Sequence, residues 1–277
     1  MMDRKAQLSI FLVIALVIVA AVILVGFLFS QGKVLPLSQE QSTTILGSQV
    51  SPVKDLISSC VEDATTSGLQ FVGARGGYAS YTEQGLNSID FAGAKVVVLA
   101  RTEKGFVNRL PSKEEFERQI SAYLNDEELG GAQIERCVDG FSLFEDDGYG
   151  VSPKKRTLNV NVGEESINVD VNWQVELSKG RARIPVEASD ALVLADAARA
   201  LRIATEIVNK EAGGVEFEGV EQDKYVTERF LTMRDFRLES QNYPTADQKI
   251  FWITSIPKDP QEKEFSFVFA VDRSVSL

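Results

Sequence analysis

The sequence contains no histidine, only two cysteines, and fewer basic than acidic residues, with 29 Lys+Arg against 40 Asp+Glu. The lack of histidine excludes catalytic triads, zinc sites and cysteine dyads that depend on imidazole. Two thiols cannot complete a four-thiolate zinc site or hold an iron–sulfur cluster by themselves. A net charge of -11 argues against a nucleic-acid partner, because phosphate binding needs concentrated Lys and Arg. We therefore expect no metal, no cofactor and no nucleic acid.

One long apolar segment lies near the N-terminus. Residues 8–29 carry no charged side chain, and a helix of that length, at about 1.5 Å per residue, would cross a hydrocarbon core of about 30 Å. The segment is longer than the apolar region of a cleavable signal peptide. It therefore predicts a transmembrane helix.

The flanking charges predict how this helix would be oriented. Arg4 and Lys5 precede it in a short tip, residues 1–7, whereas Lys33 is the next basic residue after it and stands alone for some distance. Basic residues favour the cytoplasmic side of a span. We expect a single-pass protein of the cell membrane, with a cytoplasmic N-terminus and residues 30–277 outside.

The residues at the start of the apolar segment carry a resemblance to archaeal type IV pilin-like proteins; they are Arg4, Lys5, Ala6, Gln7, Leu8 and Ser9. The resemblance implies cleavage by a prepilin peptidase between Ala6 and Gln7, with the apolar helix kept as an assembly stalk. The sequence departs from the pattern at Phe11, where many pilins carry an acidic residue, and at Gly32 and Pro36, which interrupt the stalk.

Residues 30–50 are rich in Gln, Ser and Thr and predict a weakly structured tether. The folded domain then covers residues 51–277, with a subdivision near 213–225. Its first helix is expected to begin at Ser51-Pro52 and to end or bend at Gly68. The apolar face of this helix contains Val53, Leu56, Ile57, Cys60, Val61 and Ala64.

A second helix is indicated by Ser112 and Glu115, which have the spacing of a capping box. Its apolar stripe consists of Phe116, Ile120, Tyr123 and Leu124, and a shorter segment after Gly130-Gly131 carries Cys137 on an apolar face. Outside the membrane a disulfide can persist, so we favour a Cys60–Cys137 bond over two buried thiols. Such a bond would be worth about 4 kcal/mol in the loop-entropy model.

The clearest pattern lies between Arg156 and Glu187. Apolar and polar residues alternate strictly from Ile167 to Leu177, which predicts an antiparallel meander with one buried and one wet face. Pro185 places the third strand at an edge. A further strand is expected at residues 94–100.

The remaining chain predicts a third helix, capped by Ser189 and stopped by Gly213-Gly214. Strands follow at residues 230–238, 250–256 and 265–271. The expected fold class is α+β, an N-terminal transmembrane helix followed by an exported domain of about three helices and antiparallel β-sheet.

The order of these motifs is similar to that of uncharacterised single-pass envelope proteins of small-genome archaea. It comprises two cysteine-bearing helices flanking a Gly-Gly-Tyr turn, a meander, an alanine-rich helix and a C-terminal strand with Phe265, Phe267 and Phe269. The resemblance implies an archaeal cell surface and transfers no catalytic residue. The three phenylalanines are expected to pack in the core.

Few residues suggest chemistry. Three Ser-x-x-Lys spacings would suit a serine–lysine hydrolase: Ser51 with Lys54, Ser152 with Lys155, and Ser255 with Lys258. Each contains a proline, and the spacing arises readily by chance. The acidic group 145–148 could hold a hard cation but is expected to be a solvated turn, and the glycine-rich residues 73–78 are expected to form a backbone turn.

The sequence thus predicts a non-enzymatic, membrane-anchored surface protein whose acidic ectodomain binds an envelope protein or self-associates, with no small-molecule ligand. Two alternatives remain at this point. One is a pilin-like filament subunit processed between Ala6 and Gln7, and the other is an exported Ser-Lys hydrolase.

Overall fold

The computed structural model describes residues 39–80, 85–101, 107–213 and 235–273. The helices are α2 (Gln39–Gly73), α3 (Lys113–Asn125), α4 (Gly130–Val138), the 3-10 turn η1 (Asp139–Phe141), α5 (Ser142–Asp146) and α6 (Ala197–Ala212). The strands are β1 (Ser88–Phe91), β2 (Ala94–Arg101), β3 (Val107–Asn108), β4 (Gly150–Pro153), β5 (Thr157–Val162), β6 (Ser166–Asn172), β7 (Gln174–Lys179), β8 (Ala182–Glu187), β9 (Ala191–Leu194), β10 (Phe236–Asn242), β11 (Gln248–Ser255) and β12 (Ser266–Asp272).

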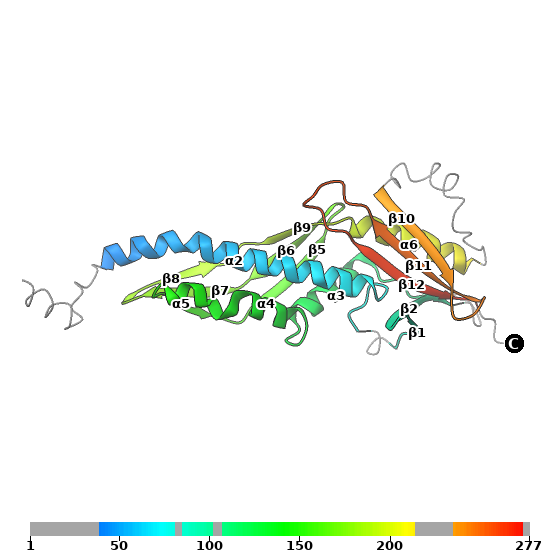
Figure 1. Ribbon diagram of the computed structural model, residues 1–277, viewed down its shortest axis with the longest axis horizontal. Helices are drawn as coiled ribbons and strands as arrows, with labels where there is room; N and C mark the ends of the chain where they lie inside the picture. Colours follow the sequence, from blue (N-terminus) through cyan, green and yellow to red (C-terminus); the bar gives the residue numbers. More distant parts are fainter. Residues whose placement is uncertain (1–38, 81–84, 102–106, 214–234, 274–277) are drawn as a thin grey trace, which may run out of the picture.

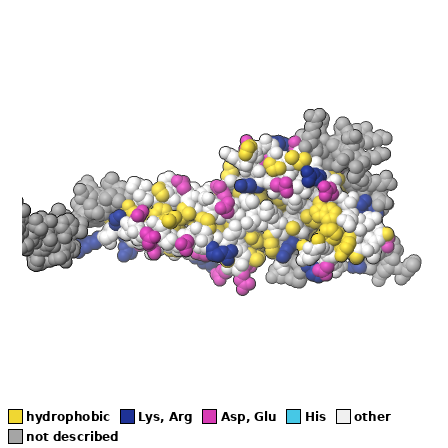
Figure 2. Space-filling model, viewed as in Figure 1, with side chains coloured by type: hydrophobic (Ala, Val, Ile, Leu, Met, Phe, Trp, Pro, Cys, Tyr) yellow, Lys and Arg dark blue, Asp and Glu magenta, His cyan; other side chains and the backbone are white. Residues whose placement is uncertain are grey.

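The molecule is elongated, with α2 running along the meander strands and the largest sheet at the far end (Figure 1). In the space-filling view, the larger group of hydrophobic side chains lies on this wider end, and acidic side chains are spread along the whole length (Figure 2). Helix α2 contacts both the meander and β12 of the large sheet. It therefore joins the two β-sheet regions.

The expected fold class needs correction in its N-terminal part. The fold is α+β, but in the ranges that the structure describes no helix is long and apolar enough to cross a membrane. The predicted tip 1–7 and span 8–29 lie outside these ranges. The sheets are also not purely antiparallel, because β12 pairs with β2 in parallel.

The tether prediction is wrong for residues 39–50, which belong to α2. Pro52 lies inside this helix rather than in its first turn. A proline at an interior position removes a hydrogen bond and costs about 3 kcal/mol. Here Leu46 and Val53 on either side of it are fully buried in the core, and this apolar contact holds the helix together.

Gly68 does not end the first helix, because α2 continues to Gly73. A Cβ atom at Gly68 would lie 2.7 Å from Cδ1 of Tyr123. The glycine therefore allows α2 and α3 to pack closely. This role depends on tertiary packing and cannot be read from the local sequence of the helix.

The second helix is confirmed as α3, with the hydroxyl of Ser112 accepting a hydrogen bond from the Glu115 N–H. The third helix is shorter than expected, since Ser189 is not its cap and α6 begins at Ala197. Residues 191–194 instead form β9 and pair with β6. Ala191 and Val193 are buried while Leu192 is exposed, and this alternation is typical of a strand rather than of a helix.

The meander is confirmed and is longer than predicted. Its sheets have the orders β4-β7-β8 and β5-β6-β9. Three pairs of consecutive strands, β4–β5, β6–β7 and β8–β9, therefore run through both sheets, and each pair is here called a long chain. The central chain is β6–β7, and each long chain breaks once between its two strands. The breaks lie at residues 154–156, at Trp173 and at residues 188–190. Two backbone bonds bridge them: Lys154 N–H donates to Gln174 O, and Ala188 N–H donates to Trp173 O.

The large sheet has the order β1-β2-β12-β11-β10, with β3 also paired to β2. The expected strand at 94–100 is confirmed as β2. The expected strand at 230–238 is found in its second part, since β10 begins at Phe236; residues 230–234 lie outside the described ranges. Phe265, Phe267 and Phe269 are almost completely buried, which confirms that they pack in the core.

Candidate functional site

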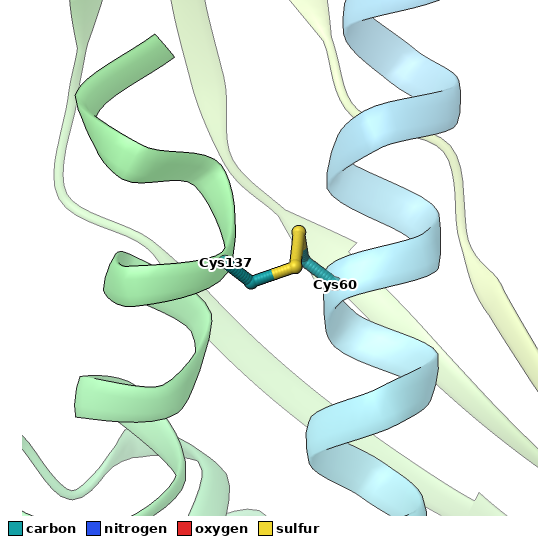
Figure 3. The surroundings of a disulfide bond; sticks show 2 residues. All are labelled: Cys60 and Cys137. Carbon is teal, nitrogen blue, oxygen red and sulfur yellow. A yellow bond between two sulfur atoms is a disulfide. The ribbon is translucent and has the colours of Figure 1, made fainter. Parts of the chain in front are cut away.

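The two cysteines form the predicted disulfide (Figure 3). Cys60 lies on α2 and Cys137 on α4, with a Cα–Cα distance of 5.6 Å. Cys60 is fully buried, but Cys137 is exposed rather than on an apolar face. The bond fastens α4 to the long helix and is a structural element.

The three Ser-x-x-Lys pairs are not assembled for catalysis. All six residues are described, and no hydrogen bond joins a hydroxyl to its lysine in any pair. The Ser51 hydroxyl donates to Asp55. The buried Ser255 hydroxyl accepts from the Phe265 N–H, while Lys258 pairs with Asp235 at 2.8 Å. The hydrolase prediction gains no support from this geometry.

The acidic residues 145–147 lie at the end of α5 and lead through Gly148 toward β4, with exposed side chains. The described ranges contain no group of three or more acidic or thiol side chains able to hold a metal ion. Residues 73–78 form a turn as predicted, and the Tyr78 hydroxyl donates to the Arg109 carbonyl at 2.8 Å. Burial raises the pKa of Tyr78. Ala6 and Gln7 lie outside the described residues.

The polar face of the meander is exposed to solvent and is here called the outer face. The inner face of the meander packs against helices, since α2 contacts β7, β8 and β9 and α3 contacts β5. The outer face carries exposed side chains from all three long chains, namely Ser152, Thr157, Asn159, Asn161, Asn168, Asp170, Asn172, Gln174, Arg183, Glu187 and Leu192. No described helix covers this face.

A groove of about 350 Å³ lies where the long chains break. Its walls come from the central chain and from the chain that holds β8 and β9: Asp170, Val171, Asn172, Trp173, Gln174, Glu187, Ala188 and Asp190. Asp190 helps to shape it, because its carboxylate accepts a hydrogen bond from the Val171 N–H at 3.2 Å. This wall of the groove is therefore held in place by a hydrogen bond within the protein.

Trp173 closes the layer beneath the groove. The residue is 1% exposed, its ring lies 6.0 Å from that of Phe141, and the Arg156 guanidinium lies 5.4 Å from the indole. Arg156 is itself held by Glu135 and donates to the Gly131 carbonyl. Among the described residues, the indole Nε1 has no hydrogen-bond partner.

Two carboxylates of the groove are not neutralised. Within the described part of the chain, neither Asp170 nor Glu187 makes an ion pair or a side-chain hydrogen bond. Arg183 donates to Glu176 instead, and Lys154 donates to the amide oxygen of Gln174. The arrangement can accept hydrogen bonds and attract positive charge, but it contains no nucleophile with a base.

Comparison of the chain with models of protein families, with curated proteins and with solved structures gave no match. The resemblances to pilin-like and archaeal envelope proteins therefore stay predictions.

The sequence identified the polar face but not the groove. Alternation runs without interruption through Trp173, so nothing in that strand marks a break. The only local signals are Pro153 before the first break and Ser189-Asp190 at the third. They become informative only when the register places the breaks side by side.

Proposed function

We propose that this protein is a non-enzymatic binding protein that contacts another macromolecule through the outer face of the meander. The observation that carries the proposal is the combination of a rigid sheet and an uncovered polar face. The inner side chains Leu158, Ile167, Val169 and Leu177 are fully buried, whereas their neighbours on the same strands are exposed. An array of amides and carboxylates held on paired strands suits recognition, since little order has to be gained on binding.

The disulfide supports a second part of the proposal, that the domain works outside the cytoplasm. Disulfides persist in oxidising compartments and are rare in the cytosol of most organisms. Cys60–Cys137 uses both cysteines of the chain. An exported domain at the cell surface is consistent with this pairing and with the acidic composition.

Site-specific photo-crosslinking in cells tests the contact surface. A benzophenone amino acid is placed at Asn159 or Asn168 on the outer face, and at Asp63 as an exposed control on α2. We expect crosslinked products from the two outer-face positions and none from Asp63. Products from Asp63 alone would overturn the choice of surface, and no product from any position would overturn the binding function.

One observation favours the filament subunit as a second candidate. Helix α2 is continuous from Gln39 through Pro52 to Gly73, so the long helix expected of such a subunit is present over this range. The test is the mature N-terminus, determined by mass spectrometry of protein from native cells. A chain that begins at Gln7 would support processing, and one that retains Met1 or Met2 would eliminate this candidate.

A further inference from the structure

The outer face suggests a partner of defined charge. We propose that the groove at the breaks of the meander docks a protein segment rich in lysine and arginine. This inference rests on the proposed binding function and adds the chemistry of the partner.

The first argument is the charge of the groove itself. Three carboxylates, those of Asp170, Glu187 and Asp190, line it together with two amides, and no Lys or Arg belongs to its lining. Asp170 projects from β6 and Glu187 from β8, on either side of the break at Trp173. A partner peptide lying across the break could therefore contact both carboxylates at once.

The second argument is that, among the described residues, no cation pairs with Asp170 or Glu187. Arg183 is paired with Glu176 at 3.0 Å, and Lys154 donates to Gln174. Elsewhere the pairs Arg202–Glu164, Arg156–Glu135 and Arg273–Glu211 engage further cations. Within the described part of the chain no ion pair neutralises Asp170 or Glu187, so a cationic partner can pair with both.

The third argument excludes a second copy of the chain as the best occupant. The whole protein carries a net charge of -11, and a second copy would bring the same acidic groove rather than a basic segment to this site. At physiological salt, charges interact over about 8 Å. Only groups close to the groove therefore decide the contact, and a basic segment has the strongest electrostatic attraction there.

The amides define how such a segment would be held. Asn172 and Gln174 flank the break on the central chain, and each amide both donates and accepts hydrogen bonds. They can bind the backbone of an extended peptide, while the carboxylates take its lysine or arginine side chains. The groove volume of about 350 Å³ has room for one or two side chains rather than a helix.

The test uses the full chain in a non-ionic detergent and a fluorescent octalysine peptide, with fluorescence anisotropy as the readout. We expect binding by the wild type that weakens as salt is added. The double variant Asp170→Asn/Glu187→Gln should weaken it about 5-fold, the loss typical of two exposed ion pairs. The matched control Asp146→Asn/Asp147→Asn removes the same charge from the α5 turn and should change affinity less than 2-fold.

A carbodiimide, which couples lysine amines to adjacent carboxylates, locates the peptide on the protein. Peptide attached at Asp170 or Glu187 would support the proposal. Attachment mainly at residues 145–147, equal weakening in both double variants, or no binding by the wild type would overturn it. If photo-crosslinking from Asn159 or Asn168 still captures a partner in that case, the binding function stands, and only the inference that the partner is basic is refuted.

Discussion

The side-chain amide of Asn125 pairs with both backbone groups of Leu158. Its Nδ2 donates to the Leu158 carbonyl at 2.8 Å, and its Oδ1 accepts from the Leu158 N–H at 3.0 Å. The same face of α3 continues the pattern, since Ser121 accepts from the Val160 N–H and Glu117 from the Val162 N–H. Helix α3 therefore occupies the edge of β5 that another strand would otherwise pair with.

This pairing predicts the effect of Asn125→Ala. The change leaves the N–H and C=O of a largely enclosed strand residue without partners, so we expect a loss of about 2 kcal/mol in the free energy of unfolding. Chemical denaturation provides the measurement. Asn159→Ala is the control, because this exposed amide has no partner in the described part of the chain, and it should change stability by less than about 0.5 kcal/mol. Equal losses in both variants would contradict the capping role.

The close approach of α2 and α3 predicts opposite effects at two glycines of the same helix. Gly68→Ala places a methyl group 2.7 Å from the Tyr123 ring, and we expect it to destabilise the protein by about 1–2 kcal/mol. Gly47→Ala meets no atom within 4 Å and should stabilise the helix by up to about 1 kcal/mol. Thermal unfolding measures both. Stabilisation by both substitutions would show that the helices do not need the glycine.

The disulfide predicts a large response to reductant. Reduction, or Cys137→Ser at the exposed position, should lower the free energy of unfolding by about 2–4 kcal/mol. Denaturation with and without reductant measures the loss in the wild type, and the Cys137→Ser variant should not respond to reductant. Complete alkylation of Cys60 and Cys137 in non-reduced, unfolded protein would refute the bond.

An acid-dependent contribution to stability is expected at the start of β10. Asp235 is paired with Arg199 at 2.9 Å and with Lys258 at 2.8 Å. Burial acts to raise the pKa of Asp235, but the hydrogen bonds from Lys258 and Arg199 outweigh it and lower the pKa. A carboxyl with a lowered pKa stabilises the fold above its unfolded value of about 3.9, and this contribution is lost as pH falls through the lowered pKa.

Asp235→Asn should therefore be less stable than the wild type at pH 7, and the difference should shrink as the pH falls below about 4. Urea denaturation at several pH values provides the measurement. Asp146→Asn, at an exposed position, serves as the isosteric control and should follow the wild type throughout. A difference at Asp235 that does not change with pH would point to packing instead of charge.

Local patterns predicted those parts of the fold in which one signal dominates. Strict alternation identified the meander, and the Ser112–Glu115 spacing identified the start of α3. The errors occur where tertiary contact overrides a local signal. Pro52 lies inside a helix because its neighbours are buried, Gly68 continues a helix because Tyr123 needs the space, and Ser189 precedes a strand because β6 provides a partner.

The candidate site was predictable only in part. The wet face of the meander follows from alternation, and the disulfide follows from the number of cysteines and the expected export. The groove could not be predicted, because it depends on three breaks that lie far apart in sequence and meet only through the strand register. The proximity of Asp170 and Glu187 likewise depends on the strand register, which places Glu187 opposite Gln174.

Helix α2 also determines how the protein would carry mechanical load. It contacts the meander and β12 and is covalently tied to α4 at Cys60, near the middle of its length. Tension applied at the Gln39 end passes along the helix to its hydrogen bond from Ser58 to the Asp190 carbonyl and to the disulfide at Cys60. A pull on the N-terminal side is then shared between the meander and α4, because the disulfide links the long helix covalently to a second helix.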